Sequence, residues 1–234
     1  MRSSHLQLTS KTTLEPRKMP VQARSAVTVA AVLEATVQVL LEVGKEQLTT
    51  TRVAYRAGVS VGTLYQYFPN KSALLQATLK RHLETVIDAV EGVCRQQRGA
   101  TLSQMATALV HAFLEAKMKD VKTSAALYFA SSDLDGVKIA RRNAVRMNQA
   151  IVAMLRTSCE GLSTDAEVVA SMVQGAMVGV SRRLLESGAP EKRFEAIRQE
   201  LVLLICTYLE ACARHSGSNS RLIHKPEPEL ARTF

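Results

Sequence analysis

The sequence predicts an all-α protein with a small helical domain at its N-terminal end and a larger helical domain after it. Apolar residues recur at helical spacing along nearly all of the 234-residue chain from Val27 onward. No proline lies between Pro69 and Pro190, so nothing in that stretch interrupts long helices. No segment alternates apolar and polar residues for the length of a strand, and we therefore expect no sheet.

The positive charge of the chain is concentrated at its N-terminal end. The chain holds 30 Lys and Arg against 21 Asp and Glu, a formal net charge of +9. Residues 1–81 contain 11 basic and 4 acidic side chains, whereas residues 82–215 contain 16 and 15. A localised basic excess indicates an anionic partner, either nucleic acid or a membrane surface.

Several classes of protein are excluded by what the sequence lacks. The four cysteines have no Cys-x-x-Cys spacing, which favours reduced thiols over disulfides or a metal site. No uninterrupted apolar run approaches ~18 residues, so we expect no membrane span, and the N-terminus lacks the apolar core of a secretory signal. Nucleophile-elbow, zinc-protease, Walker and Rossmann motifs are all missing, so we expect no catalytic residues, no cofactor and no metal.

The first elements follow from local signals. Residues 1–23 are polar and basic and predict a flexible arm. A first helix is expected from Val27 to Gly44, where glycine favours a stop. Thr49, Thr50 and Thr51 offer hydroxyl caps for a second helix about two turns long, which ends at Gly58.

A third short helix covers residues 61–68 and is closed by Pro69, because the residue before a proline is pushed out of the α region. Asn70 then caps a much longer helix. Breaks in the later helical pattern are expected near 99–101, 119–123, 131–136, 160–164 and 187–190. The predicted organisation is an arm over 1–23, a three-helix domain over 24–72, a helical domain over 73–215 and a flexible tail over 216–234.

The second and third helices describe a helix-turn-helix, in which Gly58 makes the turn and Ala54 is small enough for the helices to cross. Leu64 and Phe68 are expected in the core. The outward face of the third helix would carry Val61, Gly62, Thr63, Gln66 and Tyr67. A helix of this kind can enter the major groove of DNA with its N-terminal residues against the base edges.

This segment resembles the DNA-binding domain of the TetR family of bacterial transcriptional regulators. The resemblance covers about residues 25–75 and rests on Thr49-Thr50-Thr51-Arg52-Val53-Ala54, Ala57-Gly58-Val59-Ser60, Gly62-Thr63-Leu64-Tyr65-Gln66-Tyr67-Phe68 and Lys71. It implies an all-helical homodimer with an N-terminal three-helix DNA reader and a C-terminal domain for ligand binding and dimerisation.

The resemblance also implies roles for single residues. It suggests phosphate contacts from Thr50, Thr51, Tyr65, Tyr67 and Lys71, and base contacts from Val61, Gly62, Thr63 and Gln66. Hydroxyl groups, a Lys ammonium and a helix N-terminus are ordinary phosphate ligands, which agrees with this division. Val61 departs from the polar or basic residue common in the family, so an apolar contact to a thymine methyl is expected there. Packing of Tyr65 against the first helix remains the alternative.

The larger domain gives weaker signals. Small residues including Gly175 and Gly179 permit close helix approach, and the following helix carries an apolar stripe with Ile197, Leu201, Leu204 and Ile205. The resemblance assigns dimerisation to these two helices, and packing within one chain is the alternative. Candidate effector-binding residues are Met105, Leu109, Phe113, Tyr128, Phe129, Met147, Met154 and Met172. They would suit an apolar or aromatic compound, although such stripes also form ordinary core.

Together these observations predict a cytoplasmic, ligand-responsive regulator that is not an enzyme. It is expected to bind a palindromic operator in double-stranded DNA as a homodimer, to repress, and to be released by a small-molecule effector, with no membrane partner. The alternative is a non-enzymatic carrier or interaction module with a degenerate helix-turn-helix. The absence of acidic residues from 47 to 83 and the intact reader helix favour DNA binding.

Overall fold

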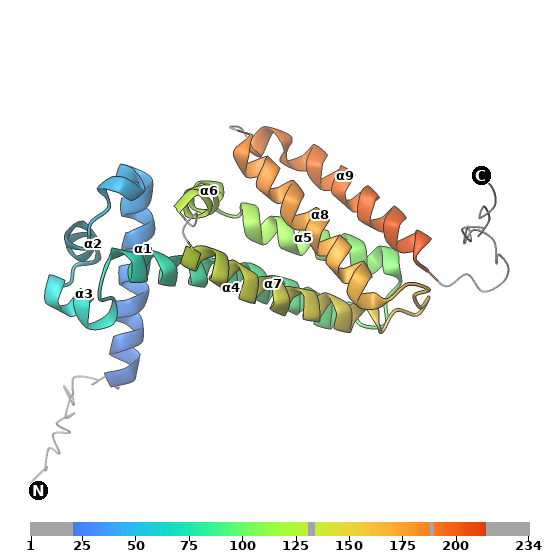
Figure 1. Ribbon diagram of the computed structural model, residues 1–234, viewed down its shortest axis with the longest axis horizontal. Helices are drawn as coiled ribbons and strands as arrows, with labels where there is room; N and C mark the ends of the chain where they lie inside the picture. The colour runs from blue at the N-terminus through green and yellow to red at the C-terminus, as the bar shows by residue number, and fades with distance from the viewer. Residues whose placement is uncertain (1–20, 131–133, 188–189, 214–234) are drawn as a thin grey trace, which may run out of the picture. The chain divides into compact units, whose positions relative to one another are not determined.

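The computed structural model describes residues 21–130, 134–187 and 190–213, and within these ranges it contains helices and no strand (Figure 1). One isolated β-bridge joins Leu162 and Ala213. The predicted all-α fold is confirmed. Most of the expected arm and the expected tail over 216–234 lie outside the described residues. The chain divides into two compact units, residues 1–78 and 79–234.

The N-terminal unit is built of three helices and the beginning of a fourth. They are α1 (Val21–Gln47), α2 (Thr50–Ala57), α3 (Val61–Tyr67) and the first turns of α4 (Lys71–Gln96). Gly44 interrupts α1 with φ at 74°, as predicted. The prediction of a start at Val27 was wrong, because residues 21–26 contain no helix breaker and extend α1 into the expected arm.

The apolar face of α1 packs into the core of this unit. Its buried residues include Val32, Leu33, Ala35, Val39 and Leu40, and α1 packs against α2. By length and composition alone, Ser25–Gln47 would suffice to cross a membrane, with a mean hydropathy of 1.8. The core helix of a soluble domain meets the same test, and Glu34 and Glu42 interrupt this run.

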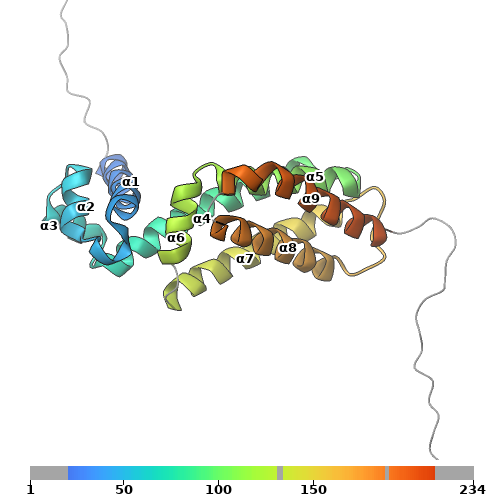
Figure 2. The same cartoon turned by 90° about the horizontal axis from the view of Figure 1, so that it is seen from above.

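The second unit is a bundle around α5. It contains the rest of α4 with α5 (Leu102–Met118), α6 (Val121–Ala130), α7 (Leu134–Leu155), α8 (Ala166–Glu186) and α9 (Pro190–Ala211). The breaks between these helices fall where the sequence predicts them. α5 contacts each of α6 to α9, and α8 lies between α7 and α9 (Figures 1 and 2). The core of this unit is therefore built on α5.

Candidate nucleic-acid interface

The helix-turn-helix is held by local caps. The Thr49 side chain accepts a hydrogen bond from the Arg52 amide (3.2 Å) and caps α2, while Gly58 ends it in the left-handed region with φ at 67°. The Ser60 hydroxyl accepts from the Thr63 amide (2.9 Å) and caps α3. Short-range sequence signals therefore set both ends of the turn.

The position of α3 is set by its buried side. Leu64 and Phe68 are buried, as predicted, and so are Val53 and Ala54 on the facing side of α2. This burial fixes α3 on α2 and leaves its other side available to a partner.

The residues expected to contact bases lie on the available side of α3. Gly62 and Gln66 are exposed, while Val61 and Thr63 are partly exposed. The Thr63 hydroxyl lies 2.8 Å from the Ser60 hydroxyl, so it is engaged at the cap. A Cβ placed on Gly62 would meet only the Ser60 hydroxyl oxygen, at an ordinary contact distance of 3.8 Å, so the fold itself does not exclude a side chain there.

The residues expected to contact phosphates lie on three helices of this unit, α2, α3 and α4. Tyr65 is exposed and its hydroxyl lies 3.1 Å from the Thr50 hydroxyl, which places both at the start of α2. Thr51 is exposed and Tyr67 partly exposed. The Lys71 ammonium donates to the Glu46 carbonyl oxygen (3.2 Å) and is partly exposed at the first turn of α4. Hydroxyl groups on α2 and α3 and the Lys71 ammonium on α4 thus lie on and around α3, the expected reader helix.

Sequence reasoning did not include Tyr55 among the residues that could contact a partner, although its side chain is 89% exposed on the outer side of α2. Its neighbour Arg56 pairs with Glu42 and donates to the Gln38 amide oxygen (3.5 Å), which ties α2 to α1. The available signal was a large aromatic residue in a two-turn helix whose buried side is already taken by Val53 and Ala54.

The residues expected at a dimer interface divide into two groups. Gly175, Gly179 and Leu204 are exposed, and Ile197 is partly buried. Leu201 and Ile205 are instead 2% and 1% exposed in the single chain. They lie in the core of this chain because α9 packs on α5. A second, exposed apolar set of Val168, Met172 and Leu203 lies on α8 and α9.

The residues expected to bind an effector are not gathered around one cavity. Met105, Leu109, Phe113, Met147 and Met154 are buried in the apolar core. Tyr128 is partly buried beneath the guanidinium of Arg182, and Phe129 and Met172 are exposed. Of this set, only Met154 borders a described cavity, a cleft of about 280 Å³ between α4 and α7.

A polar contact ties α4 to α6 within the second unit. The Ser124 hydroxyl donates to the Lys117 carbonyl oxygen (2.6 Å), so it accepts from His82 Nε2, 3.1 Å away. Burial lowers the pKa of His82, and the charge of Lys117 lowers it further, against an opposing effect of Asp120. Folding therefore disfavours protonation of His82.

Stability should fall in mild acid because of this histidine. A base whose pKa is lowered by folding binds its proton more tightly when unfolded, so the stabilisation is present above about pH 6.5 and is lost below it. We expect the free energy of unfolding to decline below that pH by up to about 1.4 kcal/mol per pH unit. Denaturant titrations should show a shallower decline for His82→Gln, and an unchanged slope would contradict the assignment.

Both units match models of known protein families. Residues 32–78 match the model described as bacterial regulatory proteins, tetR family, and residues 101–209 match the tetracyclin repressor-like C-terminal domain. The nucleoid occlusion factor SlmA of Haemophilus ducreyi is 29% identical over 144 residues, 51% of this chain and 70% of SlmA. The HTH-type regulator BetI of Klebsiella pneumoniae is 32% identical over 103 residues, 44% of this chain and 53% of BetI.

Solved structures share the fold. SmeT, the repressor of the Stenotrophomonas maltophilia efflux pump SmeDEF, aligns with a TM-score of 0.59 at 19% identity, covering 86% of this chain and 100% of that chain. A SmeT–triclosan complex aligns with a TM-score of 0.62 at 19% identity, over 86% and 99%. A putative regulator from Mesorhizobium loti reaches 0.67 at 19% identity, over 82% and 99%.

Proposed function

The chain belongs to the TetR family of bacterial transcriptional regulators, and from that membership we propose that it represses by binding a palindromic operator as a homodimer until an effector releases it. The observation that carries the proposal is α3. Its apolar side is fixed on α2 through Leu64 and Phe68, and its other side presents Gly62 and Gln66 to solvent. A reader helix needs this combination of a rigid mount and a free outer face.

We assign base contacts to Val61, Gly62, Thr63 and Gln66. The residues flanking them, which we assign to phosphates, are Thr50, Thr51, Tyr65, Tyr67 and Lys71. None of the residues assigned to bases is charged, so charge supplies affinity while uncharged side chains and DNA shape supply sequence choice. This division predicts different effects of substitution in the two groups.

The salt dependence of operator affinity tests the residues assigned to phosphate contacts. Lys71→Met should lower operator affinity and reduce the slope of log affinity against log salt by about 0.9, because one fewer counterion is released. Lys80→Met is the matched control, since Lys80 lies on the same helix and is paired with Glu84 (3.7 Å). Fluorescence anisotropy with labelled operator across a salt series gives both slopes. Equal changes of the salt slope in the two variants would show that Lys71 does not contact a phosphate.

We place the dimer interface on the outer faces of α8 and α9. Four apolar side chains, Val168, Met172, Leu203 and Leu204, are each more than half exposed in the single chain. Gly175 and Gly179 on α8 have open space at their Cβ positions, which lets a facing helix approach closely. A two-fold pair of such faces forms a closed four-helix contact, and its symmetry matches a palindromic operator.

The effector is proposed to bind in the regulatory unit. The buried Met and aromatic residues of α5 and α7 support an apolar or aromatic compound, and a protein of this fold has been solved with triclosan. α4 begins at Lys71 and continues into the regulatory unit, where His82 bonds Ser124. Movement of α4 would change the separation of two reader helices across half-sites about 34 Å apart.

Selection of bound sequences from random double-stranded DNA with the purified full chain tests the function. We expect a palindromic consensus with half-sites about one helical turn apart. Absence of any enriched sequence at low salt would contradict DNA regulation and favour the carrier with a degenerate helix-turn-helix. The selected operator then serves as the probe for every DNA-binding prediction made for this protein.

A further inference from the structure

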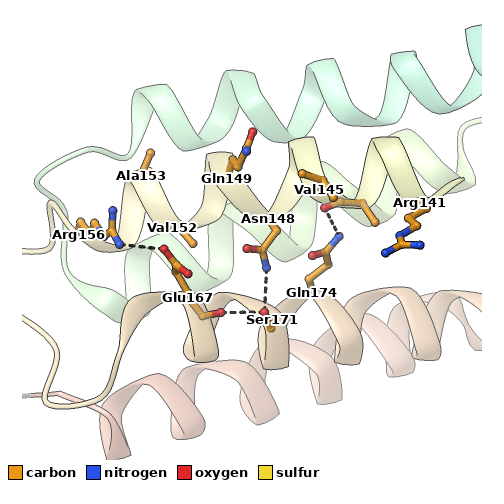
Figure 3. Close-up of a pocket in the computed structure, with 11 residues that line it drawn as sticks. Arg141, Val145, Asn148, Gln149, Val152, Ala153, Arg156, Glu167, Ser171 and Gln174 are labelled. Carbon is orange, nitrogen blue, oxygen red and sulfur yellow. Dashed lines mark hydrogen bonds and ion pairs between the residues drawn. The ribbon is translucent and has the colours of Figure 1, made fainter. Parts of the chain in front are cut away.

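A cleft of about 580 Å³ follows the seam between α7 and α8 (Figure 3). We propose that it binds a small organic anion bearing several hydroxyl groups, such as a sugar acid or a sugar phosphate. The cleft is separate from the buried apolar residues considered for an effector, and neither operator binding nor dimerisation requires it. The inference therefore goes beyond the proposed function.

The charge of the cleft favours an anion. Three charged residues line it, and two of them neutralise each other, because Arg156 lies 3.3 Å from the Glu167 carboxylate. Arg141 forms no hydrogen bond or ion pair among the described residues, and its guanidinium lies between the two helices (Figure 3). A free guanidinium is a strong ligand for carboxylate or phosphate.

Two amide side chains in the seam have fixed orientations. Gln174 Nε2 donates to the Ala144 carbonyl oxygen (2.8 Å), which can only accept. Asn148 Nδ2 donates to the Ser171 hydroxyl (3.2 Å), whose own hydrogen is donated to the Glu167 carbonyl oxygen (2.8 Å). Both amide nitrogens are therefore used across the seam, and the orientation of each amide follows from its partners.

The two side-chain amide oxygens indicate which groups the ligand carries besides its anionic group. Asn148 Oδ1 and Gln174 Oε1 accept no hydrogen bond from any residue that the structure describes. Hydroxyl groups are the natural donors to such oxygens, whereas an apolar anion would leave both without a partner in a filled cleft. The volume lies in the range of ordinary small-molecule sites, so a six-carbon ligand with bound water fits.

Isothermal titration of the full chain with four probes tests this chemistry. Gluconate and glucose 6-phosphate combine charge and hydroxyls, glucose carries hydroxyls alone, and octanoate carries charge alone. We expect each hydroxylated anion to bind at least about tenfold more tightly than either control. Equal affinity for octanoate or for glucose overturns the proposal, and so does the absence of binding by both hydroxylated anions.

Substitutions locate the binding. Arg141→Gln should weaken glucose 6-phosphate binding by about tenfold or more, and Gln174→Met should weaken it while leaving octanoate unaffected. Arg142→Gln is the matched control, because Arg142 is exposed on the same helix but does not line the cleft. Equal losses of glucose 6-phosphate affinity in both arginine variants would indicate general electrostatic attraction to the positively charged surface and would overturn the proposed site. Gel shifts with the selected operator report DNA binding separately, so failure of either proposal is distinguished from failure of the other.

Discussion

Replacing Gly62 by leucine is expected to abolish operator binding while leaving the protein at least as stable as before. Gly62 lies exposed in the first turn of α3, and a Cβ added there would make only an ordinary van der Waals contact with the Ser60 hydroxyl oxygen. Glycine is among the least favourable helix residues, so leucine should stabilise α3 by up to about 1 kcal/mol. The fold therefore does not require glycine here, which leaves the approach of a partner as the reason for it.

The loss of binding should be large because a side chain at this position would stand between the helix backbone and the base edges. We expect at least a ~100-fold loss in operator affinity, equivalent to about 2.8 kcal/mol. The operator affinity of Gly62→Ala should lie between those of the unsubstituted protein and Gly62→Leu. Gly92→Ala on α4 is a matched control with open space at its Cβ position. Anisotropy and thermal unfolding measure the two effects. Full operator affinity in Gly62→Leu would show that α3 does not face DNA at its N-terminus.

The helix-turn-helix could be predicted closely because its determinants are local. Thr49 and Ser60 cap helices by bonding amides three residues away, and Gly58 adopts the left-handed conformation that a turn requires. Leu64 and Phe68 follow from a spacing of four along one short helix. Signals of this kind can be interpreted without knowing how distant parts of the chain meet.

The regulatory unit was less predictable because its features depend on contacts between distant helices. α9 has apolar residues on two sides, and periodicity alone does not tell which side meets α5. Leu201 and Ile205 form the side in the core, and Leu203 and Leu204 the exposed side. The cleft joins polar residues of α7 and α8, such as Asn148 and Ser171, that look like solvent-facing positions in the sequence.

Replacing Leu204 by arginine is expected to convert the dimer to a monomer without unfolding the chain. Leu204 is 55% exposed, so the isolated fold gains little from its burial. In a two-fold interface each substitution occurs twice, and two guanidinium groups would face one another or lie without partners. An uncompensated buried charge costs about 3–5 kcal/mol, so dimer affinity should fall at least ~100-fold.

Light scattering coupled to size exclusion measures the change in mass, and circular dichroism checks that the helices remain. Val145→Arg is the matched control, because Val145 is 52% exposed on α7, outside the proposed interface, and this variant should stay dimeric. The monomeric variant should also lose affinity for the full palindrome while a single half-site is bound as before, because only the pairing of readers is removed. A dimeric Leu204→Arg would place the two-fold contact on another face, since an arginine cannot enter a close apolar packing of α8 and α9 without cost.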